Sequence, residues 1–330
     1  MGVGTAMLRI HFTDVDLART RVVHEPDPLW EIGQSLHRFQ TRQGRWAYAP
    51  WYRGTCQRLR EGGQQRVLRE MLLPLFHRGP YYPDFLNPAE ASEGLAAGLE
   101  AVLATPARRV LGELRTLAEF SGAPPGLREL GRPDGRRELV RALRDYHDTA
   151  IAPYGEEIQA RIDADRAVRC RALLDGGVEA VLAGLGPDIR WRRPVLHVGH
   201  PTVDRDLRLG GRGLKLIPSY FCWGTPTTMA DPAMEPVLVY PLHQQPSPVR
   251  SAGASLASLL GGTRATVLRA VAAGATTGEL ARVAGVSASS ISQHTTVLRD
   301  AGLITSQRQA ASVLHTLTPL GASMLRANLG

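Results

Sequence analysis

Cysteine is scarce in this chain. Three cysteines, Cys56, Cys170 and Cys222, are spread over 330 residues. They are too few for a disulfide framework, and they lie too far apart for a zinc knuckle or a Cys-x-x-Cys redox pair. We therefore expect all three to be buried thiols.

Long apolar runs are also missing. No stretch approaches the roughly 18 to 20 apolar residues that a membrane-spanning helix needs. The N-terminus lacks the basic start, apolar centre and small-residue cleavage site of a secretory signal. The composition, 43% hydrophobic and 21% charged, is ordinary for a soluble globular protein. We expect a cytoplasmic protein with no membrane partner.

Motifs of common enzymes are absent as well. The chain has no G-x-S-x-G elbow, Walker A loop or H-E-x-x-H helix, and GGRGLK (210–215) lacks the last glycine of G-x-G-x-x-G. The adjacent Glu156 and Glu157 lie in a helical pattern, so their side chains diverge by about 100° and do not form a catalytic pair. The expectation is a protein without catalytic residues or a cofactor.

One set of residues has metal-ligand chemistry, namely His197, His200, Cys222 and His243. His197 and His200 are three positions apart, and on a strand an odd offset points two side chains to opposite faces unless the chain bends. We interpret the three histidines as ordinary polar side chains and the cysteine as an ordinary thiol, and we expect no bound metal. A bend in the strand would leave the metal alternative open.

Lysine is nearly absent, because 38 of the 39 basic residues are arginine. The net charge of +8 is uneven, since residues 251–330 combine six arginines with only Glu279 and Asp300, a net charge of +4. The other 250 residues share the remaining +4. A compact basic unit favours nucleic-acid binding, because neutralising phosphates releases condensed counterions.

The composition divides the chain in two. HQQPSPVRSAGAS (243–255) replaces periodic apolar residues by Pro, Gln, Ser and Gly, which is typical of a linker. We expect an N-terminal domain over 1–242 and a C-terminal domain over 256–330, with an α+β fold class overall.

The predicted N-terminal domain is mixed. LRIHF (8–12) alternates as a strand, and Asp27 and Pro28 supply the N-cap and first turn of a helix. Helical patterns cover 63–77 and most of 90–184, and strand patterns run from 191 to 242. Within the latter region Gly210, Gly211 and Gly213 indicate a hairpin turn.

Two short helical patterns meet at Gly285 in the C-terminal domain. Thr276 and Glu279 have the spacing of a capping box at the start of the first helix. Ser287 can cap the second helix, whose apolar side carries Ile291, Thr295 and Leu298 at helical spacing. The opposite side carries the short polar residues Ser289, Ser290, Gln293 and Thr296.

That polar side suits the major groove of DNA. Hydroxyls can contact phosphates or base edges, and the amide of Gln293 can pair bidentately with adenine. The alternative is a plain solvated helical hairpin, but its surface would favour Glu, Lys and other long side chains. The pattern therefore predicts a DNA-recognition helix with Gln293 as the base-reading residue.

A wing and a terminal helix follow. Residues 303–305 and 313–317 alternate as strands joined by SQRQAAS, and a helix is predicted from Pro319 to Leu329. From about 256 to 328 the chain resembles the winged helix-turn-helix of ArsR/SmtB-like bacterial regulators through ELARVAGVS, SISQHTTVLRDAGLI and VLHTLTPLG. The resemblance implies a homodimer bound to a double-stranded DNA operator. The predicted DNA-contacting residues are Ser287, Ser289, Ser290, Gln293, His294, Thr296, Arg299 and Arg308.

Two departures from that family are visible. ELARVAG (279–285) has no cysteine where the founding metal sensors carry cysteine pairs, so metal sensing is not expected. The wing tip has one arginine, Arg308, and no glycine, which predicts modest DNA affinity. Over nearly its full length the chain resembles a large actinobacterial subgroup through LRIHFTDVDLARTRV, PDPLWEIGQSLHR and LIPSYFCWGTP. That resemblance implies an appended sensor or dimerisation domain.

Two aromatic stretches are the candidates for an effector site. YFCW (220–223), interpreted as a strand with Tyr220 and Cys222 on one face and Phe221 and Trp223 on the other, and the loop PYYPDF (80–85) could line an apolar pocket. The alternative is that they only fill the core. The predicted ligand-binding residues are Tyr82, Phe85, Tyr220, Phe221 and Trp223.

The function that these patterns favour is transcriptional regulation. We expect a DNA-binding repressor that responds to a small organic molecule. The alternative is a regulator-derived protein whose N-terminal cavity binds a ligand or catalyses a reaction, with the winged helix kept for dimerisation.

Overall fold

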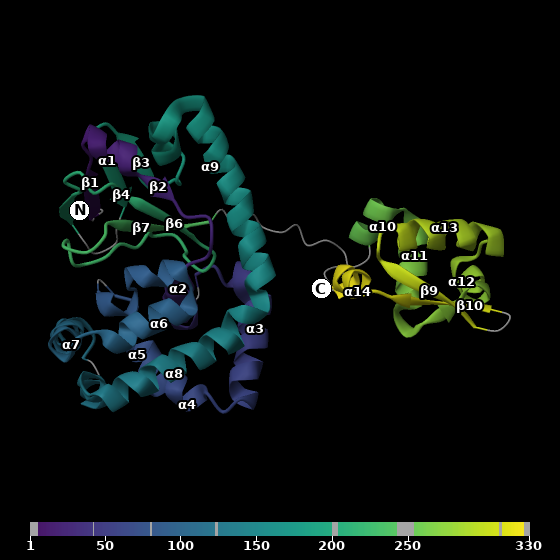
Figure 1. The fold of residues 1–330 in the computed structure, drawn as a ribbon, viewed down its shortest axis with the longest axis horizontal. Coiled ribbons are helices and arrows are strands. Elements are labelled where there is room, and N and C mark those ends of the chain that lie inside the picture. The colour runs from purple at the N-terminus through teal and green to yellow at the C-terminus, as the bar shows by residue number, and fades with distance from the viewer. Residues whose placement is uncertain are drawn as a thin grey trace, which may run out of the picture. The chain divides into compact units, whose positions relative to one another are not determined.

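The chain forms two compact units, Met1–Gln245 and Pro246–Gly330 (Figure 1). The computed structural model describes residues 6–41, 43–79, 81–122, 125–199, 204–242, 254–309 and 312–326. Most of the predicted linker, residues 243–253, lies outside these ranges. Within them, no helix is both long and apolar enough to cross a membrane.

Helices make up most of the N-terminal unit. They are α1 (Asp14–Arg19), α2 (Pro28–Gln40), α3 (Arg45–Glu61), α4 (Gln65–Val67), the π-helix η1 (Leu68–Leu72), α5 (Leu73–Leu75), the 3-10 helices η2 (Asp84–Leu86) and η3 (Ala89–Glu93), α6 (Leu95–Ala104), α7 (Ala107–Ser121), the 3-10 helix η4 (Pro125–Gly131), α8 (Pro133–Ala150), the 3-10 helix η5 (Ala152–Tyr154) and α9 (Gly155–Ala183). The helices predicted over 63–77 and most of 90–184 are confirmed.

Helix α2 begins where its capping residues predict. The Asp27 carboxylate accepts hydrogen bonds from the backbone N–H of Leu29 and Trp30 at 3.2 and 3.1 Å, and Pro28 occupies the first turn. Leu29, Ile32 and Leu36 are fully buried. The helix contacts α3, α5, α6, α8 and a β-strand, so it connects the helical core of this unit to its strands.

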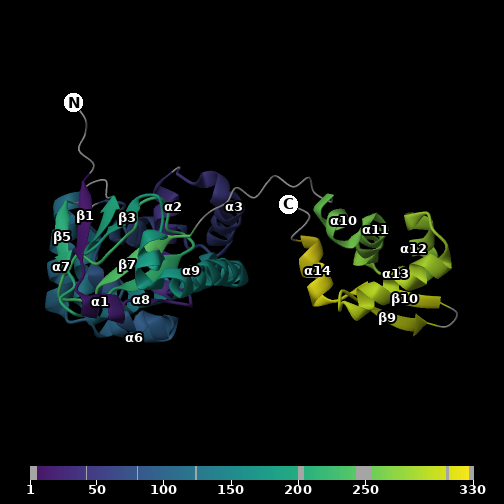
Figure 2. The same ribbon diagram turned by 90° about the horizontal axis from the view of Figure 1, so that it is seen from above.

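Two sheets complete the unit. Their strands are β1 (Met7–His11), β2 (Arg21–Val22), β3 (Ile189–Arg192), β4 (Val195–Gly199), β5 (Arg205–Arg208), β6 (Lys215–Ser219) and β7 (Val237–Pro241). One sheet has the order β3-β4-β1-β5, and the other has the order β2-β6-β7. Strand β1 pairs antiparallel with β4 and parallel with β5. Figure 2 shows β5 beside β1. In Figure 1 the strands lie at one end of the unit and helix α8 at the other, with α9 alongside.

The predicted glycine hairpin is wrong. Strand β5 pairs with β1, whereas β6 pairs in parallel with β2 and β7, so the chain changes sheets at the glycines. All three glycines have positive φ, as a sharp turn requires. Gly213 also passes close to the chain, because an added Cβ would lie 2.6 Å from the carbonyl oxygen of Arg19. The turn was correctly located, but its strand partners are set by distant segments.

Two smaller expectations also fail. Strand β6 ends at Ser219, so residues 220–223 are not the strand that was predicted. Of the three cysteines, Cys222 is buried, Cys56 is half-buried and Cys170 is exposed. The expectation of three buried thiols therefore holds for Cys222 alone.

The C-terminal unit is a small helical domain with one sheet. Its elements are α10 (Ala254–Leu260), α11 (Gly262–Ala270), the 3-10 helix η6 (Val271–Ala273), β8 (Ala275–Thr276), α12 (Thr277–Ala284), α13 (Ala288–Asp300), β9 (Ile304–Gln309), β10 (Ser312–Leu317) and α14 (Pro319–Arg326). The sheet order is β8-β10-β9. The two helices around Gly285 and the terminal helix are confirmed, as is the α+β class.

The wing is more regular than its sequence indicated. Most of SQRQAAS belongs to the strands, since Gln309 pairs with Ser312 at the end of a six-residue antiparallel register. The strand β8, which the sequence did not predict, adds a third member by pairing Ala275 with His315. The wing is therefore attached directly to the segment that begins α12.

Candidate nucleic-acid interface

Helix α12 starts at a complete capping box. The Glu279 backbone N–H donates to Thr276 Oγ1 at 3.4 Å, and the Thr276 backbone N–H donates to the Glu279 carboxylate at 2.8 Å. The hydrogen bonds that the backbone N–H and the hydroxyl of Thr276 donate to the carboxylate lower the pKa of Glu279. The helix ends at Gly285, whose φ of 65° is the left-handed conformation that glycine adopts at little cost. The capping box and Gly285 together set the direction in which the next helix leaves.

Replacing Thr276 by alanine should destabilise α12 by about 1 kcal/mol, because the Glu279 N–H loses its acceptor and the Glu279 carboxylate loses the hydroxyl that donates to it at 2.8 Å. Thr276→Ser keeps the hydroxyl and should keep most of the stability. Amide hydrogen exchange across α12 in the full chain measures this local opening. Equal exchange in the two variants would show that the capping box does not stabilise the helix.

One side of α13 is bound to the core of the domain. Ile291, Thr295 and Leu298 are 0%, 3% and 1% exposed, and Ile291 and Leu298 pack in the same core as Leu280 of α12. The helix is N-capped by Ser287, whose hydroxyl accepts a hydrogen bond from the Ser290 backbone N–H at 3.2 Å. Because the apolar side is buried, the opposite side of the helix must face outward.

The outward side carries most of the predicted contact residues. Ser287, Ser289, Gln293 and Thr296 are exposed, and Ser290 and His294 are half-buried. At the start of α13 the Ser287 hydroxyl is 2.8 Å from that of Ser289 and 3.1 Å from that of Ser290. A helix N-terminus with clustered hydroxyls offers hydrogen-bond donors to an anion such as a phosphate.

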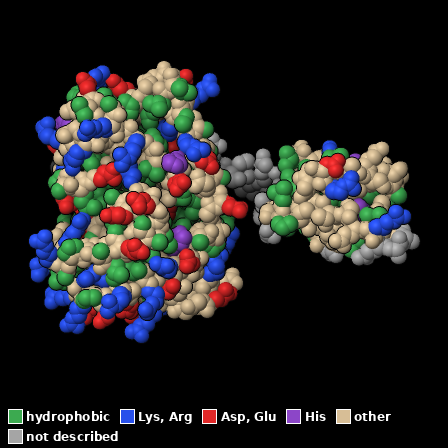
Figure 3. Space-filling model, in the orientation of Figure 1, with side chains coloured by type: hydrophobic (Ala, Val, Ile, Leu, Met, Phe, Trp, Pro, Cys, Tyr) green, Lys and Arg blue, Asp and Glu red, His purple; other side chains and the backbone are tan. Residues whose placement is uncertain are grey.

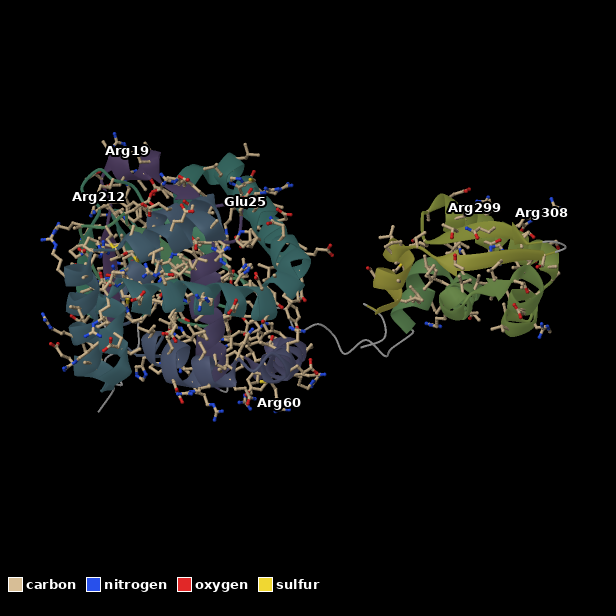
Figure 4. All side chains as sticks on the ribbon, turned by 60° about the horizontal axis from the view of Figure 1, so that its bottom comes forward. Arg19, Glu25, Arg60, Arg212, Arg299 and Arg308 are labelled. Atoms are coloured by element: carbon tan, nitrogen blue, oxygen red, sulfur yellow. The ribbon has the colours of Figure 1, made fainter. Side chains whose placement is uncertain are left out.

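Arginines lie beside this helix face. Arg299 is exposed at the end of α13, donates to the Thr296 hydroxyl at 3.4 Å and lies 3.7 Å from the Asp300 carboxylate. Arg308 is exposed on β9. Figure 4 shows Arg299 and Arg308 along the same edge of the unit, and acidic side chains cover little of the face shown in Figure 3. Both acidic residues of this unit are also engaged, Glu279 in the capping box and Asp300 with Arg299.

A buried histidine ties the wing to α12, and the sequence reasoning missed it. His315 is 3% exposed, and its Nε2 and Nδ1 lie 3.1 and 2.8 Å from the hydroxyls of Thr277 and Ser306. Burial lowers the pKa of His315, so the ring is neutral at neutral pH. Strand alternation places His315 on the same face as Val313 and Leu317, a signal that could have indicated an inward position.

The predicted effector residues are divided between two environments. Tyr82 and Trp223 line a cavity of about 450 Å³ in the N-terminal unit. Phe85, Tyr220 and Phe221 are 2%, 4% and 0% exposed and pack in the hydrophobic core instead. Tyr82 and Trp223 therefore share the cavity, whereas Phe85, Tyr220 and Phe221 lie in the core, which was the alternative interpretation of these stretches.

The histidine and cysteine set is not assembled as a site among the described residues. They contain no group of three or more His, Cys, Asp or Glu side chains that could hold a metal ion. His197 lies on β4 and Cys222 is buried in an apolar cluster. His200 and His243 lie outside the described residues.

Comparisons with known proteins single out the C-terminal unit. Residues 259–307 match a family described as a helix-turn-helix domain. Over 56 residues the chain is 43% identical to the HTH-type transcriptional regulator YgaV of Escherichia coli strain K12, an alignment that covers 17% of this chain and 57% of YgaV. The chain thus spans little more than half the length of that relative. Among solved structures, reduced HlyU from Vibrio cholerae N16961 is 26% identical, with 23% of this chain and 84% of HlyU covered and a TM-score of 0.20.

The matched residues coincide with the geometry described above. The range 259–307 contains the capping box, Gly285, the whole of α13 and the start of β9. The hairpin of β9 and β10 and the helix α14 follow directly, as in a winged helix. The C-terminal unit of this chain is therefore an ArsR-like winged helix-turn-helix domain.

Proposed function

We propose that this protein is a sequence-specific DNA-binding repressor that acts as a homodimer and whose N-terminal domain senses a small organic molecule. The observation that supports DNA recognition most directly is the outward side of α13. It is largely exposed, carries no Asp, Glu, Lys or Arg from Ser287 to Leu298, and is rich in hydroxyl and amide groups. Such a surface can form hydrogen bonds to base edges and phosphates in the major groove of DNA.

The roles of the residues follow from their chemistry. Gln293 lies in the middle of α13, where its amide can donate to and accept from one adenine edge. Ser287, Ser289 and Ser290 at the helix start, with Thr296 further along, suit phosphate oxygens or nearby base edges. Arg299 and Arg308 add the positive charge that binds the DNA backbone without reading its sequence. His315 would hold the wing against α12 in this arrangement.

Dimerisation predicts a symmetric operator. In a two-fold dimer two copies of α13 face the DNA, so protection footprints on the protein's own promoter should show an inverted repeat. The half-sites should lie about one DNA turn, roughly 10 base pairs, or a multiple of that apart. A fragment with one half-site should bind much more weakly than the full site.

Two outcomes would contradict this proposal. A stable monomer that protects a single asymmetric site would overturn the dimer model. If the protein binds neither the promoter fragment nor any other genomic fragment, the DNA-recognition proposal is overturned. That result would favour a regulator-derived protein that kept the winged helix for dimerisation alone. Sedimentation of the full chain, with and without the fragment, separates the two outcomes.

A further inference from the structure

The cavity of the N-terminal unit is built from segments distant in sequence. Helix α2 contributes Gln34, His37 and Arg38, and most of the rest comes from residues 78, 79, 81, 82 and 84 and from the segment 223–230. Leu8 of β1 and Arg205 of β5 complete the wall. The volume of about 450 Å³ lies within the range of small-molecule sites.

Arg38 is the unusual group in this wall. The side chain is 4% exposed, yet its Nε and Nη1 have no hydrogen-bond partner. Its guanidinium lies 5.9 Å from the centre of the Tyr48 ring, and no ion pair of the described residues includes it. A buried cation without a counter-charge is costly, so natural proteins rarely keep one unless something else pairs with it.

The surrounding charges leave Arg38 without compensation. Burial lowers the pKa of Arg38, and the neighbouring cation Arg78 lowers it further. Burial also lowers the pKa of His37 to about 3, so this ring is neutral, and its buried Nε2 has no hydrogen-bond partner either. His37 and Arg38 both line the cavity from α2, and each has buried side-chain nitrogens without a hydrogen-bond partner.

The one carboxylate in the wall is already occupied. Asp84 accepts hydrogen bonds from the backbone N–H of Ala230 at 3.0 Å and of Asp231 at 2.7 Å. Its negative charge acts on Arg205, which in turn donates to the carbonyls of Met229 and Ala230. Asp84 thus holds the loop 223–230 and does not neutralise Arg38. The lining as a whole keeps an excess of positive charge.

Aromatic rings form the apolar part of the wall and are held in place. Trp223 contacts Trp46 and Tyr48 edge to face, with ring centres 5.7 and 5.8 Å apart. Gly44 lies against the indole with a φ of 67°, and an added Cβ there would be 2.6 Å from it. Tyr82 packs against the His37 ring with centres 5.7 Å apart. A flat apolar group could lie against Trp223 and Tyr82 with little rearrangement.

We propose that this cavity binds a small organic carboxylate, whose anionic group pairs with Arg38 and whose apolar body lies against Trp223 and Tyr82. A carboxylate matches the planar donors of arginine and supplies the missing counter-charge. Exposed Arg78, which donates to the Gln43 side chain at 2.7 Å, adds positive charge for the entering anion. The role of this ligand as the effector rests on the regulatory function proposed above. The binding of the carboxylate in the cavity does not depend on that function.

The test uses the full chain without DNA. Benzoate, phenylacetate and 3-phenylpropionate are titrated while tryptophan emission is recorded, with benzamide as the uncharged counterpart of benzoate. We expect saturable quenching by at least one carboxylate and at least tenfold weaker binding of benzamide. Arg38→Met should lower the affinity for the carboxylate roughly tenfold or more, because a charge-assisted pair is lost. The matched control Arg60→Met changes an exposed arginine of α3 (Figure 4) and should leave binding unchanged.

Thermal unfolding of the same variants without ligand provides a second measurement. Removing an unpaired buried cation should leave the melting temperature of Arg38→Met unchanged or higher, whereas loss of a structural arginine would lower it. If Arg38→Met does not fold, the variant Arg78→Met tests the site instead, and unchanged carboxylate binding by Arg78→Met would overturn the proposal. Arg78→Met, at an exposed position, should weaken the carboxylate severalfold in either case.

Other results would also overturn the carboxylate site. These are no binding by any of the three carboxylates, equal binding of benzoate and benzamide, or unchanged binding by Arg38→Met. Failure of the regulatory function looks different. If the chain binds a carboxylate but no DNA, the carboxylate site stands and the repressor function fails. If the chain binds DNA but no carboxylate, the repressor function stands and the carboxylate site fails.

Discussion

Gln293→Ala should lower the affinity for the specific operator by about 1 to 3 kcal/mol, roughly 5- to 150-fold in Kd, because a bidentate contact to one base is lost. Affinity for random DNA should change little, since Gln293 carries no charge and releases no counterion. Competition titrations of operator and shuffled sequence at one salt concentration measure both affinities.

The design of this comparison depends on a matched control. Gln57→Ala makes the same chemical change at an exposed position of helix α3 in the other unit, where the amide donates to Glu61 at 2.9 Å. It should leave both affinities unchanged. If Gln293→Ala also leaves operator and random DNA unchanged, Gln293 does not read a base. The reading residue must then be sought elsewhere on the outward side of α13.

Glu31→Ala should reduce the free energy of unfolding of the N-terminal domain by roughly 2 to 5 kcal/mol. Glu31 is 1% exposed, and its carboxylate accepts hydrogen bonds from the backbone N–H of Tyr220 and Phe221 at 2.7 and 3.1 Å. The Ser219 hydroxyl donates to it as well, at 3.1 Å. Alanine would remove the acceptor that all three buried donors share. Trp223 lies only two residues after Phe221 and lines the cavity, so the loss of the Glu31 hydrogen bonds should also disturb the cavity wall.

Urea unfolding followed by tryptophan emission measures this effect in one domain. All five tryptophans, at positions 30, 46, 51, 191 and 223, lie in the N-terminal unit, so the winged helix is silent in this signal. Glu31→Gln keeps an acceptor oxygen and should lose less stability. Glu100→Ala removes an exposed carboxylate of α6 and should cost little. A wild-type midpoint for Glu31→Ala would show that residues 219–221 do not depend on this anchor.

The sequence predicted best those features that depend on neighbouring residues. The capping box of Thr276 and Glu279, the left-handed Gly285 and the cap at Ser287 each involve residues at most three positions apart or one backbone conformation. The same is true of Asp27 and Pro28 at the start of α2. Local hydrogen bonds and steric limits suffice for such elements, so the reading of α12 and α13 needed no tertiary information.

Local sequence patterns did not predict which strands pair with each other. The glycines at 210–213 indicated a turn, but whether the two flanking strands pair with each other depends on β1, β2 and β7. The added strand β8 is only two residues long and is defined by its partner β10. A strand's hydrogen bonds go to another segment, so a pattern within one segment cannot name that partner.

The sequence by itself determined the helices α12 and α13 and the outward polar face of α13 on which Gln293 lies, because helical periodicity and capping act within one turn of the chain. The cavity was decided only by the tertiary structure. Arg38 and Glu31 stand in the same helix pattern as ordinary charged residues, yet one is buried without a partner and the other accepts hydrogen bonds from residues 188 to 190 positions away. Burial and long-range partners depend on which segments fold over α2. Periodicity within a helix carries no record of those segments.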